Sequence, residues 1–282
     1  MKYEVLQSTH YQYSLPVRES INQCIFKPIG NDNQTMIQYE QAITPSAVAS
    51  EHRDYWGNEV VTFYIWEPHS ELQVRTRTIL DLHHKELVLK MTNEIEAEMN
   101  KVSFKQTFAE FLMSTRYTQL NSDIIHFITS ELKRDQIDLL TFVEKLNSYI
   151  YEQFSYLPGS TDVTTVASDA FFKKTGVCQD FTHIMLGICR SQGIPARYVS
   201  GYIYSGEDVA MRGDSVTHAW VEVYFPTYGW IGFDPTNNMI AQNQHICVAT
   251  GRDYADITPL KGVHIGNGYQ DLKVSISVKA AQ

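Results

Sequence analysis

The sequence contains few of the residues that build disulfide frameworks, metal clusters or disordered tracts. Its four cysteines form no C-x-x-C pair, which argues against a disulfide scaffold and a zinc site. Fifteen glycines and nine prolines in 282 residues are too few for a low-complexity chain. No apolar run approaches a membrane-spanning length, and the first residues lack the apolar region of a secretory signal. We therefore expect a soluble, cytoplasmic, globular protein.

Positive charge is also scarce. The chain has 23 lysines and arginines against 32 acidic residues, a formal net charge of −9. This balance argues against nucleic acid or an anionic membrane as the main partner. The length allows one large domain or two ordinary ones, each with its own core.

Residues 1–92 are predicted to be mostly strand. Short β-rich runs separated by turn residues are expected at 3–6, 11–15, 21–28, 36–43, 60–66 and 72–81. Their spacing is typical of a β-sandwich or barrel, and we expect a β-sandwich-like domain. His83 and His84 are adjacent, and neighbours on a strand point to opposite faces, so we favour a loop or strand end over a metal pair.

Residues 93–282 are predicted to form a second unit in which helices precede strands. Helices are expected at 122–132, 138–151 and 168–174, and strands at 196–204, 217–225 and 230–234. The tail from His245 to Asp271 is rich in glycine, and we expect it to be irregular. A strand is predicted at 272–278. The sequence leaves open whether that strand pairs with the N-terminal domain or extends the sheet of the second unit.

The stretch Thr175–Pro195 points to chemistry. Apolar residues at positions 181, 184, 185 and 188 have the spacing of one buried helical face, and Gly193 and Pro195 end the helix. Cys178 then stands at the helix start, where the macrodipole favours a thiolate. Asp180 is interpreted as a first-turn carboxylate that stabilises the helix end, and His183 as facing elsewhere. The alternative for Cys178 is a buried small hydrophobic residue.

A cysteine nucleophile needs a base, and the base needs a group that orients it. His218 lies in the strand T-H-A-W-V-E-V, and Asp234 ends the next one. Plain alternatives are a half-buried histidine and an Asp-Pro turn. If the hairpin is symmetric about Thr227–Tyr228, His218 and Asp234 lie on opposite faces. A shift that sets Trp220 opposite Asp234 places them on one face, and we predict that shifted register.

Four motifs resemble the core of the bacterial transglutaminase-like superfamily: G-V-C-Q-D-F-T-H, G-I-P-A-R-Y-V-S-G-Y, H-A-W-V-E-V and G-W-I-G-F-D-P-T-N. The N-terminal part resembles the region often joined to this core in bacteria. The segment Gly251–Pro259 resembles the one that ends such proteins. The approach Asp214–Thr217 departs from the family pattern, in which a shorter, alanine-containing segment is expected.

The resemblance implies an α+β fold in which a papain-like transglutaminase core, with its cysteine helix packed on an antiparallel sheet, follows the β-sandwich-like domain. It implies Cys178 as nucleophile, His218 as base and Asp234 as orienting acid, acting on peptide or glutamine-type amides through a thioester. A cysteine peptidase or amidase is the first expectation. A protein-glutamine transglutaminase and a non-catalytic binding module are the alternatives.

The remaining expectations concern the surroundings of the triad. The backbone N–H of Cys178 is a plausible oxyanion donor. Tyr156 or Gln153 is a candidate second donor, against simple packing at a helix end. Trp220 is expected to pack beside the imidazole of His218 and limit water. We expect a peptide or protein substrate and no cofactor or metal ion. The oligomeric state is left open.

Overall fold

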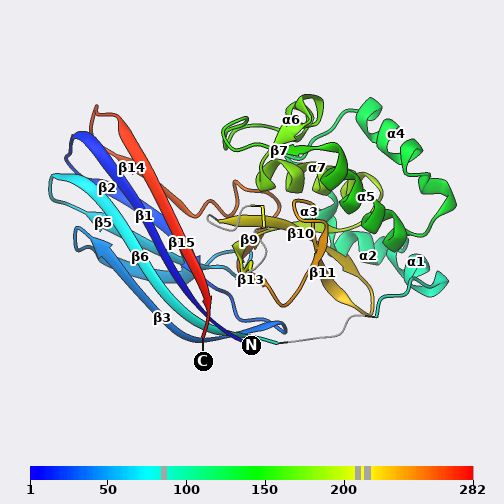
Figure 1. Ribbon diagram of the computed structural model, residues 1–282, viewed down its shortest axis with the longest axis horizontal. Helices are drawn as coiled ribbons and strands as arrows, with labels where there is room; N and C mark the ends of the chain where they lie inside the picture. The colour runs from blue at the N-terminus through cyan, green and yellow to red at the C-terminus, as the bar shows by residue number, and fades with distance from the viewer. Residues whose placement is uncertain (84–87, 207–210, 213–216, 282) are drawn as a thin grey trace.

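The computed structural model describes residues 1–83, 88–206, 211–212 and 217–281. The chain has the α+β fold that the sequence predicts, with a β-sandwich beside a core of helices and sheet (Figure 1). One sandwich sheet has the order β15-β1-β6-β3 and the other has the order β14-β2-β5-β4. Their bounds are β1 Lys2–Val17, β2 Ser20–Lys27, β3 Gln34–Thr44, β4 Val48–Arg53, β5 Glu59–Ile65, β6 His69–Leu82, β14 Leu260–His264 and β15 Gln270–Ala280.

β1 is one long strand, where the sequence predicts two short runs. Gln7 and Thr9 break the apolar pattern, yet both are buried on the same face as Tyr3 and Val5. Gln7 Oε1 accepts hydrogen bonds from Thr76 Oγ1 of β6 and, at 3.1 Å, from a tyrosine hydroxyl of the core. Gln7 thus contacts the core, and Gln7 Nε2 donates to Thr9 Oγ1 at 3.0 Å, so alternation of apolar residues cannot reveal that these two positions are buried. β4 was also not expected, because all six of its residues are exposed.

The last two strands return to the sandwich. β15 pairs antiparallel with β1, from Tyr3 opposite Ala280 to Tyr13 opposite Gln270. β14 pairs with β2. The alternative that the sequence left open is therefore decided in favour of the N-terminal sheets, and the division of the chain at residue 92 stays a prediction.

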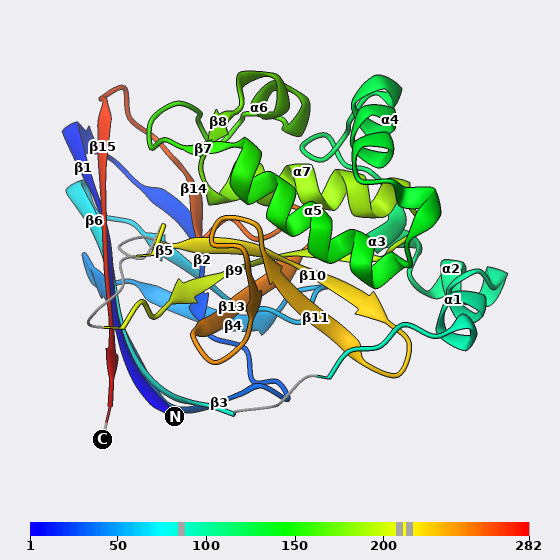
Figure 2. The same cartoon turned by 45° about the vertical axis from the view of Figure 1, so that its right-hand side comes forward.

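The core is built on one antiparallel sheet with the order β12-β11-β10-β9-β13. Helices α7 and α5 lie over one face of this sheet (Figure 2). The strands are β9 Ala196–Ile203, β10 His218–Phe225, β11 Gly229–Asp234, β12 Met239–Ala241 and β13 His245–Gly251. The helices are α1 Asn93–Met99, α2 Val102–Thr107, α3 Ala109–Leu112, α4 Ser122–Glu131, α5 Leu139–Gln153, α6 Ala167–Lys173 and α7 Cys178–Ser191, and the short strands β7 Ser155–Tyr156 and β8 Thr175–Gly176 pair in parallel.

The expectation of an irregular tail from His245 to Asp271 is wrong, because β13 and β14 lie within it. All seven residues of β13 are buried. A strand covered on both faces has no alternation of polar and apolar residues. Periodicity therefore could not distinguish H-I-C-V-A-T-G from a loop.

The helix α7 is held tightly in the core. Twelve of its residues besides Cys178 are buried, and Arg190 donates from its guanidinium to the carbonyl oxygens of Ala196 and Arg252. A side chain at Gly187 would lie 2.3 Å from the carbonyl oxygen of Thr118, so only glycine admits this close approach. The first residue of α7 is thus fixed relative to the sheet. None of the described helices is long and apolar enough to cross a membrane.

Trp220 occupies a space that two glycines leave on the neighbouring strands. A Cβ at Gly201 of β9 would lie 2.8 Å from the Trp220 ring, and one at Gly232 of β11 would lie 3.3 Å from Trp220 Nε1. The Gly201 position is tighter still, because its Cβ would meet the carbonyl oxygen of Ile246 at 1.9 Å.

We expect Gly201→Ala to destabilise the protein strongly, by about 3 kcal/mol or more, because strands β9 and β13 must separate to admit the methyl group. Urea unfolding measures the change. Gly30→Ala is the matched control, since a Cβ there meets nothing within 4 Å. Equal stability of the two variants would contradict the packing described for Trp220.

Candidate active site

Cys178, His218 and Asp234 come together from three elements. Cys178 is the first residue of α7, His218 the first of β10 and Asp234 the last of β11. Strands β10 and β11 pair with Val221 opposite Phe233 and Glu222 opposite Gly232, so the register continues to Trp220 opposite Asp234. The predicted shift of the hairpin is confirmed. It puts His218 and Asp234 on one face, and His218 Nε2 donates to Asp234 Oδ2 at 2.8 Å.

Cys178 lies against the start of β10. Its Sγ is 3.9 Å from the carbonyl oxygen of Thr217, and its side chain is close enough to His218 to influence the charge of the imidazole. Cys178 is 7% exposed, so a small reagent has limited but real access. The thiol also stands at the N-terminal end of a 14-residue helix.

Asp180 closes the start of this helix, as predicted. Its Oδ2 accepts hydrogen bonds from Val177 N at 2.8 Å and from Thr161 Oγ1 at 2.7 Å. Val177 has no side-chain acceptor of its own, so Asp180 supplies the cap. A Cβ at Gly176 would lie 2.7 Å from Asp180 Oδ2, which explains the glycine two residues before the cysteine.

The charges of the histidine and the aspartate support one another. Burial by itself lowers the pKa of His218, but the carboxylate of Asp234 and the neighbouring Cys178 outweigh it and raise the pKa to about 10. Burial alone would raise the pKa of Asp234. The charge of His218 and the hydrogen bonds from His218 and His245 nevertheless hold that pKa well below its usual range. At neutral pH the pair is therefore an imidazolium beside a carboxylate.

Asp234 is fixed by donors on both of its oxygens. Its Oδ1 accepts from Thr236 N at 2.9 Å and from Asn237 N at 3.2 Å. Its Oδ2 accepts from Asn237 Nδ2 at 2.9 Å in addition to His218. A further donor is His245 Nε2, 3.1 Å from Oδ2. The carboxylate is fully buried, and this set of donors compensates for its lost hydration.

Sequence reasoning missed His245, which lies in the stretch that was expected to be irregular. The side chains of His218, Asp234 and His245 are all buried, and their ligand atoms lie within 4.8 Å of one another. That spacing could also suit a metal ion. However, the two His–Asp separations are ordinary hydrogen-bond distances, so hydrogen bonds already account for the cluster.

Trp220 lies beside His218, with ring centroids 6.2 Å apart and planes at 28°. Tyr156 is half-buried in β7, which pairs with β8 directly before the cysteine helix. Gln153 is exposed at the last residue of α5. A role for either residue as an oxyanion donor stays a prediction.

His183 and His83 were not expected to belong to the catalytic group, and both lie in other surroundings in the structure. His183 is completely buried, accepts from Tyr254 N at 3.3 Å, stacks on Tyr117 and lies tilted against Tyr198. His83 is exposed at the end of β6, where Nε2 lies 3.1 Å from the Thr35 hydroxyl. His84 and most of the Asp214–Thr217 segment lie outside the described residues.

The other three cysteines differ from Cys178. Cys24, Cys189 and Cys247 are buried, and burial raises the pKa of Cys24 and Cys189 to about 12 and that of Cys247 still further. Each is a free thiol in the interior. Such thiols are unreactive at neutral pH.

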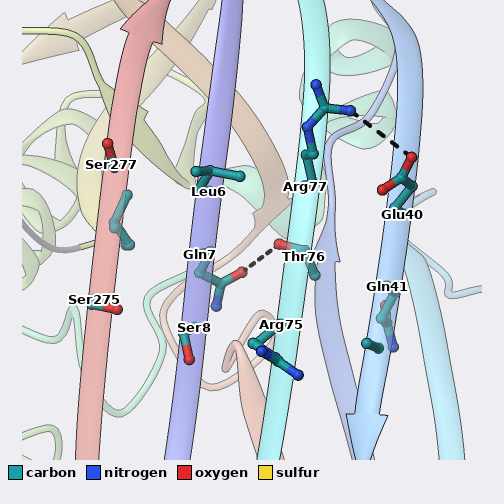
Figure 3. A pocket seen from close by; sticks show the side chains of 12 residues that line it. Leu6, Gln7, Ser8, Glu40, Gln41, Arg75, Thr76, Arg77, Ser275 and Ser277 are labelled. Carbon is teal, nitrogen blue, oxygen red and sulfur yellow. Dashed lines mark hydrogen bonds and ion pairs between the residues drawn. The ribbon is translucent and has the colours of Figure 1, made fainter.

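A hollow of about 620 Å³ lies over the sandwich sheet β15-β1-β6-β3 (Figure 3). Its lining includes Leu6, Ser8 and Arg75, and Arg77 faces Glu40 across it at 3.9 Å. Neither the cysteine nor the histidines of the core line this hollow. The chemistry-bearing residues therefore gather in the core and not in this hollow.

Comparison with known proteins agrees with this geometry. Residues 127–235 match the family model of the transglutaminase-like superfamily, and residues 3–81 match that of the bacterial transglutaminase-like N-terminal region. The first match spans all three residues of the Cys-His-Asp group.

Relatives and solved structures extend the match beyond the two regions. An uncharacterized protein of Mycobacterium leprae (strain TN) is 33% identical over 277 residues, 97% of each chain. A protein-glutamine gamma-glutamyltransferase of Pseudomonas aeruginosa is 31% identical over 127 residues, which cover 41% of this chain and 19% of the relative. The crystal structure of a candidate cysteine protease from Cytophaga hutchinsonii is similar in fold, with a TM-score of 0.75 and 22% identity over all of this chain and 91% of the other.

Proposed function

Since the chain belongs to the transglutaminase-like superfamily, we propose that it is a thiol-dependent acyl-transfer enzyme, in the first place a cysteine peptidase or amidase. One observation carries the proposal: Cys178, at the start of a helix, is close enough to His218 to raise the pKa of its imidazole, and His218 Nε2 is hydrogen-bonded to the buried Asp234. This is the sequence of nucleophile, base and orienting acid that covalent amide chemistry requires.

In the proposed acylation, the Cys178 thiolate attacks the carbonyl carbon of an amide and forms a C–S bond. The carbonyl oxygen becomes an oxyanion, and the backbone N–H of Cys178 is one donor for it, with Tyr156 or Gln153 as candidates for a second. His218 gives its Nδ1 proton to the departing nitrogen as the C–N bond breaks. A thioester on Cys178 and a free amine result. Trp220 beside the imidazole limits the access of water.

In the proposed second step, His218 takes a proton from water or from an incoming amine, which attacks the thioester carbonyl. The C–S bond breaks and the thiolate returns. Hydrolysis and transamidation differ only in this attacking group. The named activity of the Pseudomonas aeruginosa relative favours protein-glutamine transamidation as the second candidate, over the part of the core that it matches.

We expect iodoacetamide near neutral pH to alkylate one cysteine of the folded protein, Cys178. The three other thiols are buried and have raised pKa values, so they should react only after unfolding. Mass spectrometry of the digested protein locates the label. An unreactive Cys178 would favour the other class of function, a non-catalytic binding module with this fold.

A peptide library incubated with and without a primary amine distinguishes the reactions. Cleaved peptides indicate a peptidase, and a mass gain on glutamine that needs the amine indicates a transferase.

We include a cytoplasmic location in the proposal, which fractionation of the cells tests directly.

A further inference from the structure

We propose that His245 is a positioning residue of this site: it donates to the same oxygen of Asp234 that His218 uses, and so keeps His218 available as a base for the step that resolves the thioester. This inference rests on the proposed function. It assigns a fourth residue to the Cys178–His218–Asp234 group.

The position of His245 is the first argument. In the core sheet β9 separates β13 from β10, yet His245 at the start of β13 reaches Asp234 at the end of β11. The other donors to Asp234 come from His218 or from the turn that follows β11. His245 is thus the donor that joins the carboxylate to a separate strand.

Among the described residues, the hydrogen-bond partner of the His245 side chain is Asp234, and the rest of the ring is surrounded by other rings. Trp220 meets the His245 ring edge-on at 5.0 Å, and the His218 ring lies 6.0 Å away. Among the described residues, His245 Nδ1 has no hydrogen-bond partner although it is buried. A buried nitrogen without a partner lowers stability. An apolar side chain would avoid that loss, so packing alone gives no reason for a histidine here.

The charge of His245 follows from its neighbours. The titratable groups that influence it are Asp234 and His218, and those that influence His218 are Asp234 and Cys178. Burial outweighs the attraction of Asp234 and lowers the pKa of His245. His245 is therefore neutral at neutral pH, and the proton it carries sits on Nε2, facing Asp234.

The consequence appears after the thioester has formed. The thiolate has then been consumed, and His218 must be neutral to accept a proton from water or an amine. Asp234 opposes this, because its charge holds a proton on His218. A hydrogen bond from His245 to Asp234 Oδ2 withdraws part of that charge. Without His245, His218 stays protonated to higher pH, and resolution of the thioester slows near neutral pH.

p-Nitrophenyl acetate separates the two steps in the full-length protein. Attack by the Cys178 thiolate releases p-nitrophenolate, which leaves with its electron pair and needs no proton from His218. Water then attacks the acetyl thioester, His218 accepts the proton, and acetate is released. The first step appears as a burst and the second as the steady rate.

We expect His245→Leu, which removes the donor but keeps the bulk, to leave the burst rate within about twofold. Its steady rate near neutral pH should fall about tenfold, with the acidic limb of the steady-rate profile moved up by about one pH unit. His245→Gln places an amide N–H near the position of Nε2 and should restore the steady rate to within about threefold. Ile246→Val, which truncates the next residue on the other face of β13, is the control for loss of packing and should change neither phase.

The inference is overturned if His245→Leu leaves the steady rate and its acidic limb unchanged. It is equally overturned if the Leu and Gln variants lose both phases together along with thermal stability, since His245 would then be only a structural residue. A wild-type protein without a burst, or a burst that persists in Cys178→Ala, would instead refute the proposed function on which the inference rests.

Discussion

Replacing Cys178 with alanine should abolish both the burst and the steady turnover of p-nitrophenyl acetate, a loss on the order of 10⁶-fold for the nucleophile of a triad. The alanine keeps the backbone N–H at the helix start and the contacts of α7 with the sheet. Binding and oxyanion stabilisation therefore survive while the covalent step is lost. Stopped-flow absorbance of p-nitrophenolate measures both phases, and intact-mass spectrometry looks for the acetyl adduct.

Cys189→Ala is the matched control for this variant. Cys189 belongs to the same helix and is fully buried, but it lies far along α7 from the triad. We expect wild-type burst and turnover, at a modest loss of stability from the smaller side chain. If Cys178→Ala retained full turnover on any substrate, Cys178 could not be the nucleophile.

Asp234→Asn should cost about 10⁴-fold in turnover, the size of effect that loss of the carboxylate has in a serine-protease triad. The amide is nearly isosteric but carries no charge. In the wild-type protein the raised pKa of His218, about 10, keeps the imidazolium populated from neutral pH up to that value. In the variant the attraction of the Asp234 carboxylate is lost, while burial and the neighbouring Cys178 remain, so the pKa of His218 should fall.

The pH profile of alkylation by iodoacetamide reads out this change. Wild-type Cys178 should react rapidly at neutral pH as the partner of an imidazolium, and His218 should hold its proton up to about pH 10. In Asp234→Asn the reaction should be slow at neutral pH and rise with pH like that of an ordinary thiol. Asp253→Asn is the control, because Asp253 is another buried carboxylate whose Oδ1 accepts from Ala255 N away from the triad. Unchanged profiles in both variants would contradict a role for Asp234.

The parts of the site that the sequence predicts are those with a local signature. Cys178 was found because a glycine turn, a helical apolar face and a Gly-x-Pro stop surround it. His218 and Asp234 were found because two strands with clear alternation flank a short turn. The shifted register that the strands adopt was predicted from the requirement that the two side chains share a face, since a symmetric turn would have separated them. These inferences depend on residues close together in the chain.

What the sequence could not give depends on contacts between distant segments. His245 lies in a strand buried on both faces, where no alternation shows that it is a strand or which way the histidine points. Gln7 is polar on the inner face of β1, where it accepts a hydrogen bond from Tyr202 of the core sheet, and no local pattern records that neighbour. The sequence was enough to predict the fold class. Of the partners of Asp234 it predicted His218 but not His245.

The pairing of β15 with β1 affects the order in which the protein can assemble. While the chain emerges from the ribosome, β1 and β6 are made early, but β1 has no neighbour on its other side until residues 270–280 exist. In the interval one edge of β1 presents unpaired backbone groups, the kind of edge that recruits foreign strands. Sandwich strands thus both precede and follow the core in the chain, and β15, which covers the free edge of β1, is synthesised after the core. Protection of the β1 edge must therefore wait until the whole core has been synthesised.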